Sequence, residues 1–333
     1  MKRSHLLRIV FSALFGFVLL ALLLSRLSIS GLAKMVSDVP LWYWMFGLLI
    51  YLTVTVIRAL RFWVLIFGKI SLMEMIPITG IHLFLNALLP FRTGEASYVY
   101  LVRRTKKISG SEGLASLLIA RIFDMIVVAL FFLTSVMFVE SIPALMMQAI
   151  VVISIFLCLI IIALFMLIFL KDTLLTLLRS ICIRMGIGNS RIVLFLLSKA
   201  ESVVTYFNVM KSKRRILWIF LLTLLIWSLL YSMPFLLFKS IEVDVSLPKS
   251  IMGNTFLELS SILPIYTVGG VGIVEGAWSL AFISLGIQTQ TAISTGITYH
   301  LLLLTYIAIT GALSFALRSK LSRKVKKDMG KGA

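Results

Sequence analysis

The sequence predicts an all-α polytopic membrane bundle, and three observations support this fold class. Hydrophobic residues make up 60% of the 333 residues and charged residues only 14%, against roughly 25% charged in ordinary soluble domains. Several apolar stretches approach the ~20 residues that a spanning helix needs. Lysine and arginine gather between particular stretches rather than evenly. The composition excludes a soluble globular protein, and the presence of only two cysteines excludes a disulfide-rich scaffold.

Six apolar stretches are predicted to be full spans. The first follows Lys2, Arg3 and Arg8 and resembles a signal peptide. The residues after it offer no small-x-small cleavage site, so we expect an uncleaved helix. The six stretches are Ile9–Leu24, Trp42–Ile57, Leu114–Val139, Ala144–Leu170, Ile216–Phe238 and Thr291–Leu317.

The basic residues predict the orientation, because cytoplasmic loops of membrane proteins carry an excess of Lys and Arg. Placing the N-terminus inside puts 27 of the 32 basic residues in cytoplasmic segments and four outside. We therefore expect a multi-pass protein of the plasma (inner) membrane with both termini in the cytoplasm. The net charge of +19 then reflects topology, and we expect no nucleic-acid partner.

Two apolar segments, near residues 75–95 and 251–285, do not fit simple spans. Pro90 and Gly94 interrupt the first, and Pro264 and a glycine cluster interrupt the second. Broken backbone at membrane depth is tolerated only where protein buries it or a wet cavity adjoins it. The flanking charges predict two re-entrant hairpins that enter from opposite faces. Interrupted helices in inverted positions indicate a transporter's midplane site, although chance coincidence of two breaks is the alternative.

The remaining segments are expected to lie outside the bilayer core. Apolar residues recur at helical spacing near 190–212, which predicts an amphipathic helix in the inner headgroup region. Its basic end either sets topology or attracts anionic lipid. We divide the chain into a membrane domain, residues 1–318, and a basic cytoplasmic tail, residues 319–333.

Three motifs together resemble the lysylphosphatidylglycerol synthase transmembrane-region family, the flippase-like module of the multiple peptide resistance factor. They are the run from Asn86 to Glu95, the Arg121-x-x-Asp124 pair, and the Leu263-Pro264 string that ends at Glu275-Gly276. The resemblance implies transfer of a phospholipid or lipid-linked headgroup between leaflets. Two-part members add a soluble aminoacyltransferase domain. The sequence ends at Ala333 after a short tail, so we expect no synthase activity.

Charged residues within or beside spans are the main candidates for a binding site, because they are costly in lipid. Arg121 and Asp124 share a helix face and can neutralise each other or bind a headgroup. Arg92 is the preferred phosphate ligand, since a guanidinium forks onto two phosphate oxygens, and Glu95 is its neighbour. Arg58 and Arg61 are interpreted as ordinary inside anchors, although Arg61 could reach a lipid phosphate.

The second hairpin contributes carboxylates and glycines. Glu258 and Glu275 could meet a headgroup amine or carry a coupling proton. Alternatively, Glu275 could cap a helix or pair with an arginine. The glycines are expected to let helices approach closely or to let the backbone bend, because the string lacks the strand and third glycine of a dinucleotide fingerprint. His82 and His300 are expected to be hydrogen-bonded packing residues, so we predict neither a metal site nor a cofactor.

The function that we predict is movement of a lipid headgroup between leaflets through a polar cavity where the hairpins meet. The expected partners are an anionic phospholipid or lipid-linked substrate, with a homo-oligomer or a separate lipid-modifying synthase as further candidates. The second hypothesis is a membrane enzyme that transfers a glycosyl or phosphoryl group, which is disfavoured because no acid/base constellation is evident. The third hypothesis is a membrane scaffold for a lipid-modifying synthase. The predicted binding residues are Asn86, Arg92, Glu95, Arg121, Asp124, Glu258, Gly269, Gly270, Gly272 and Glu275.

Overall fold

The computed structural model describes residues 17–25, 36–89, 93–139, 212–260 and 267–329, with short pieces between 147 and 190. Within these residues the protein is helical and contains no strand, which confirms the all-α membrane bundle. The principal elements are α3 (Leu41–Leu65), α4 (Leu72–Leu88), α5 (Glu95–Arg103), α6 (Gly110–Phe138), α10 (Lys213–Ser240), α11 (Leu247–Ser260), the 3₁₀ turn η2 (Val268–Gly270), α12 (Ile273–Ser284) and α13 (Thr289–Met329).

Four described helices, α3, α6, α10 and α13, are long and apolar enough to cross a membrane. Their outer faces expose large apolar side chains, such as Phe46 on α3 and Leu217 on α10. Such surface would be unstable in water and suits a lipid environment. The predicted spans Ile9–Leu24 and Ala144–Leu170 and the helix predicted near 190–212 lie largely outside the described residues, so the number of six spans stays a prediction.

Sequence signals explain where two of these helices begin. Ser71 and Glu74 form a capping box at the start of α4, and Ser109 and Glu112 form another at the start of α6. In each, the serine hydroxyl accepts from the glutamate N–H while the glutamate carboxylate accepts from the serine N–H. Lys69 forms an ion pair with Glu112. The turn after α3 is thereby joined to the start of α6.

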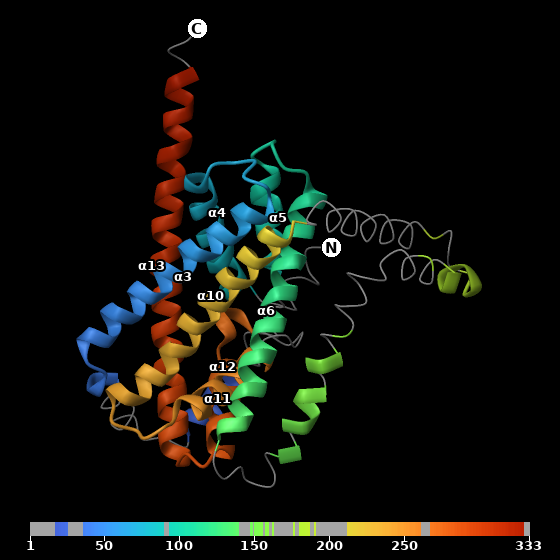
Figure 1. Ribbon diagram of the computed structural model, residues 1–333. Coiled ribbons are helices and arrows are strands. Elements are labelled where there is room, and N and C mark those ends of the chain that lie inside the picture. The colour runs from blue at the N-terminus through green and yellow to red at the C-terminus, as the bar shows by residue number, and fades with distance from the viewer. Residues whose placement is uncertain are drawn as a thin grey trace.

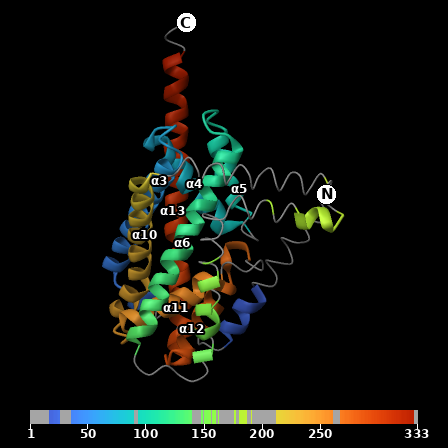
Figure 2. The same cartoon turned by 45° about the vertical axis from the view of Figure 1, so that its right-hand side comes forward.

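Both segments predicted as hairpins form a helix, a break and a second helix. Helices α4 and α5 pack together, as do α11 and α12. At 1.5 Å per residue, α4 is about 25 Å long, α11 about 21 Å and α12 about 18 Å, all below the ~30 Å hydrocarbon thickness. Figures 1 and 2 show α4 and α5 at the end of the bundle from which α13 projects, and α11 and α12 at the opposite end.

The described chain contains two halves, α3–α6 and α10–α13, which have the same order of elements but run in opposite directions through the bundle (Figure 1). A span, a half-helix, a break, a half-helix and a span follow in order as α3–α6 and again as α10–α13. The helix contacts are equivalent in the two halves. Helix α4 contacts α13, and its counterpart α11 contacts α6; likewise α5 contacts α6, and its counterpart α12 contacts α13. The first spans of the two halves, α3 and α10, contact each other. Helices α3 and α10 run in opposite directions (Figure 1). This is an inverted-topology repeat, a plan found in many transporters.

Gly94 marks the closest approach within the first helix pair. An added Cβ at this position would lie 2.3 Å from the Asn86 Cα and 2.4 Å from the Leu85 carbonyl oxygen. These are backbone atoms of α4, which cannot move aside as a side-chain tip could. A glycine is therefore required where α5 begins against α4.

We expect Gly94→Ala to lower the free energy of unfolding by about 1–3 kcal/mol, as overpacking does in other cores. The matched control is Gly276→Ala in α12, where an added Cβ meets nothing within 4 Å and should be neutral or slightly stabilising. Thermal unfolding of both variants in detergent measures the difference. Equal stability of the two variants would contradict the close approach.

Candidate functional site

A cavity of ≈ 180 Å³ lies where the two hairpins meet. Residues from α4, α11 and α12 line it together with residues from the spans α3, α6, α10 and α13. The two broken segments therefore come together in the bundle. The polar lining consists of Tyr51, Arg58, Arg61, His82, Asn86, Arg121, Asp124, Asn254, Glu258 and Tyr299.

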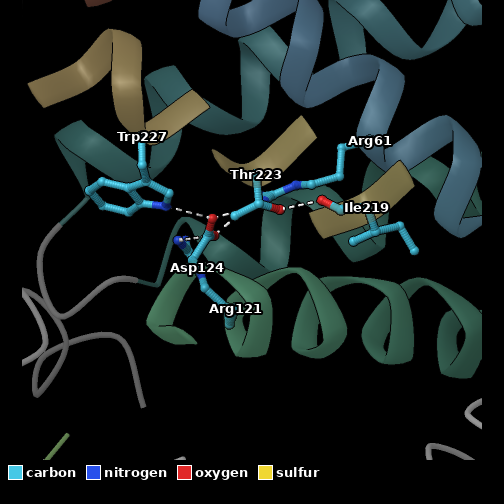
Figure 3. A network of polar contacts seen from close by, with 6 residues as sticks. All are labelled: Arg61, Arg121, Asp124, Ile219, Thr223 and Trp227. Carbon is cyan, nitrogen blue, oxygen red and sulfur yellow. Dashed lines mark hydrogen bonds and ion pairs between the residues drawn. The ribbon is translucent and has the colours of Figure 1, made fainter. Parts of the chain in front are cut away.

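Asp124 on α6 is the centre of a buried network (Figure 3). Arg61 from α3 donates to both of its carboxylate oxygens, at 2.6 Å and 3.2 Å. Trp227 from α10 donates its indole N–H to Oδ1 at 3.0 Å, and Thr223 accepts from Arg61 at 3.1 Å. Arg61 and Asp124 are each 2% exposed. The buried pair is therefore bidentate, and together with Thr223 and Trp227 it cross-links α3, α6 and α10.

Arg121 is shared between two carboxylates. Its Nη2 lies 2.8 Å from an oxygen of Glu95 on α5, and its Nη1 lies 3.8 Å from Asp124. The expected mutual neutralisation of Arg121 and Asp124 is therefore secondary, because the shorter and bidentate partner of Asp124 is Arg61. The side chains of Arg121 and Glu95 are about one-third exposed, so this pair is the more accessible of the two.

Arg58, one turn before Arg61, lines the same cavity but is differently placed. It is half-buried and makes no hydrogen bond or ion pair with any residue that the structure describes. The interpretation of Arg58 and Arg61 as inside anchors assumed that the span ended at Ile57, whereas α3 continues to Leu65. The signal was in the sequence: no glycine or proline follows Ile57 until Gly68.

Glu275 belongs to a second polar cluster, at the glycine turn of the second hairpin. Its Oε2 accepts from the Gly272 N–H at 2.7 Å, and its Oε1 lies 2.8 Å from Nδ1 of His300 on α13. The other ring nitrogen of His300 lies 2.9 Å from the Gly269 carbonyl oxygen. Glu275 and His300 are 4% and 2% exposed. This carboxylate caps α12 and fastens the turn to α13.

The glycines of this turn have a conformational role. Gly269, Gly270 and Gly272 have φ of 65°, 74° and 83°, values that favour residues without a Cβ. The expectation that they let the backbone bend agrees with this geometry. None of the three lines the cavity.

The predicted binding residues thus separate into groups. Asn86, Arg121, Asp124 and Glu258 line the cavity, and Glu95 adjoins it through Arg121. Glu275 and the glycines form the second cluster. Arg92 lies outside the described residues. Among the residues that the structure describes, no group of three or more His, Cys, Asp or Glu side chains could hold a metal ion.

The fold and cavity define an integral membrane protein of transporter-like plan, with two inverted helix–break–helix units around buried charges. The sequence model of the family described as lysylphosphatidylglycerol synthase TM region matches residues 6–311. The chain belongs to this family, as the three motifs indicated. Neither a search of curated proteins nor a search of solved structures gave a match.

Removing one partner of the buried Arg61–Asp124 pair should destabilise the protein. We expect Arg61→Met or Asp124→Leu alone to lower the free energy of unfolding by about 3–5 kcal/mol, because each strands a buried charge. The double variant should recover at least half of that loss. Glu95→Gln, which breaks a partly exposed pair, should cost about 1 kcal/mol or less. Unfolding in detergent measures all four, and additive losses in the double variant would contradict the coupling.

Proposed function

We propose that this protein moves a phosphate-bearing lipid headgroup between leaflets through the cavity where the hairpins meet. The observation that carries the proposal is Arg58, a guanidinium facing the cavity without a hydrogen-bond or ion-pair partner among the described residues. An arginine presents planar donors that match phosphate oxygens. The family's association with lysylphosphatidylglycerol synthase supports a lipid substrate.

The neighbouring charges suit this role. Asp124 binds Arg61 bidentately, so the pair is nearly neutral and Arg61 is not a free ligand for an anion. Arg121 is more accessible and lies between Glu95 and Asp124, so it could rotate toward an entering anion while keeping one carboxylate partner. Phosphate hydration would then be replaced by fixed protein charges, which lowers the free energy of a headgroup inside the bilayer.

The inverted repeat supplies a route for the movement. In transporters of this plan, one repeat rocks against the other around a site near the midplane. The acyl chains would stay in lipid while the headgroup passes through the cavity. The proposal places the protein in the plasma membrane with both termini in the cytoplasm, as the basic residues predict.

The test is lipid movement by the purified protein in liposomes that contain a fluorescent phospholipid. Accessibility of the fluorophore to a membrane-impermeant quencher reports how much lipid has changed leaflet. We expect Arg58→Gln to slow the movement roughly 10- to 100-fold, since a hydrogen bond to a charged group is worth about 1.5–3 kcal/mol. Arg58→Lys should retain part of the rate, because it keeps the charge and loses the fork.

Arg103→Gln is the matched control, because this exposed arginine ends α5 outside the cavity and should leave the rate unchanged. Product analysis of the same liposomes separates transport from catalysis. Chemical conversion of the lipid without change of leaflet would favour the membrane enzyme over the transporter. Equal rates for the wild type and Arg58→Gln would reject the role of the cavity.

A further inference from the structure

Two asparagines that line the cavity have carboxamide oxygens without a hydrogen-bond partner. The Oδ1 of Asn86 on α4 and the Oδ1 of Asn254 on α11 are both buried and unpaired. Asn254 as a whole is 1% exposed, and both residues line the cavity. The two asparagines therefore come from opposite hairpins and line the same cavity as Arg58.

Buried polar atoms in proteins are almost always paired. An acceptor that stays unpaired when a ligand covers it weakens binding roughly tenfold. The same oxygen contributes to binding when the ligand brings an N–H or O–H to it. Two such acceptors beside a cationic guanidinium suit a ligand that has an anionic group at one point and hydrogen-bond donors at another.

We propose that Asn86 and Asn254 select the headgroup by accepting hydrogen bonds from it. The preferred cargo is a phosphodiester lipid whose headgroup carries donors, either hydroxyl groups or a primary ammonium. This inference rests on the proposed function and adds the chemical class of the cargo. Arg58 would bind the phosphate common to all such lipids, while the two asparagines distinguish among the groups attached to it.

The cavity walls also offer aromatic rings, which give a competing expectation. Tyr51, Phe62 and Tyr299 line the cavity, and aromatic faces attract quaternary ammonium groups such as choline. A choline headgroup has no hydrogen to give to the asparagines and would leave both oxygens covered and unpaired. Sites built to hydrogen-bond a ligand reject analogues that lack the donor far more strongly than apolar sites reject a changed size. The acceptors therefore favour the donor-bearing headgroup.

The experiment uses phosphatidylethanolamine and its mono-, di- and trimethylated derivatives, all labelled on the acyl chain. Phosphate and net charge are equal across this series, while the number of ammonium hydrogens falls from three to none. We expect the wild-type protein in liposomes to move the unmethylated lipid at least tenfold faster than the trimethylated lipid. Asn254→Leu should reduce this ratio to within about twofold, mainly by slowing the unmethylated lipid.

Thr79→Val is the matched control. Thr79 also has a buried hydroxyl oxygen without a partner, but it does not line the cavity, so this variant should keep the wild-type ratio. Asn86→Leu is the second test of the same proposal and covers the case that Asn254→Leu fails to fold. Phosphatidylglycerol, whose donors are hydroxyl groups, distinguishes the two donor types.

The outcomes separate the two proposals. Equal wild-type rates along the methylation series would overturn the selectivity and leave lipid movement intact. A wild-type ratio that persists in both asparagine variants would also overturn it. Absence of movement for every lipid would overturn the proposed function and this inference together.

Discussion

The buried contact between Arg61 and Asp124 is the interaction on which the arrangement of the cavity depends. It joins α3 to α6, while Trp227 and Thr223 extend the network to α10. A charge in a membrane interior is expensive unless another charge and hydrogen bonds compensate it. These partners lie on three helices, so the charges of Arg61 and Asp124 are compensated only when α3, α6 and α10 pack together. The network then sets the wall from which Arg58 and Arg121 face the cavity.

The inverted repeat explains why one cavity receives residues from such distant parts of the chain. Each half contains a pair of helices too short to cross the bilayer, and each pair packs against a span of the other half. Half-helices end inside the protein, where their terminal N–H and C=O groups need protein or ligand partners. Glu275 meets one such need by accepting from the Gly272 N–H. The cavity lies between these helix pairs and takes polar residues from both.

The sequence was sufficient for the class of fold and for the position of both broken segments. Composition, stretch length, and the breaks at Pro90 and Pro264 carry that information locally. The partner of Asp124 was predicted less well, because spacing reveals neighbours on one helix and not contacts between helices. Arg121 satisfies the three-residue rule, yet Arg61 is 63 residues away in sequence. Arg58 was misassigned for a related reason, since an arginine was assumed to end a span that continues for two further turns.

Helix α13 is one continuous helix that contacts the glycine turn of the second hairpin and helix α4 of the first, and then extends beyond the bundle (Figure 2). It contains 41 residues and at 1.5 Å per residue is about 60 Å long, roughly twice the hydrocarbon thickness. Its inner part holds His300 against the Glu275 cluster and packs on α4, while its far end projects from the bundle (Figure 2). A rod of this length acts as a lever. From His300 to Met329 the helix runs 29 residues, or about 44 Å. A rotation of about 10° around His300 would displace the tip by about 8 Å, so small rearrangements beside the glycines become larger displacements at the surface.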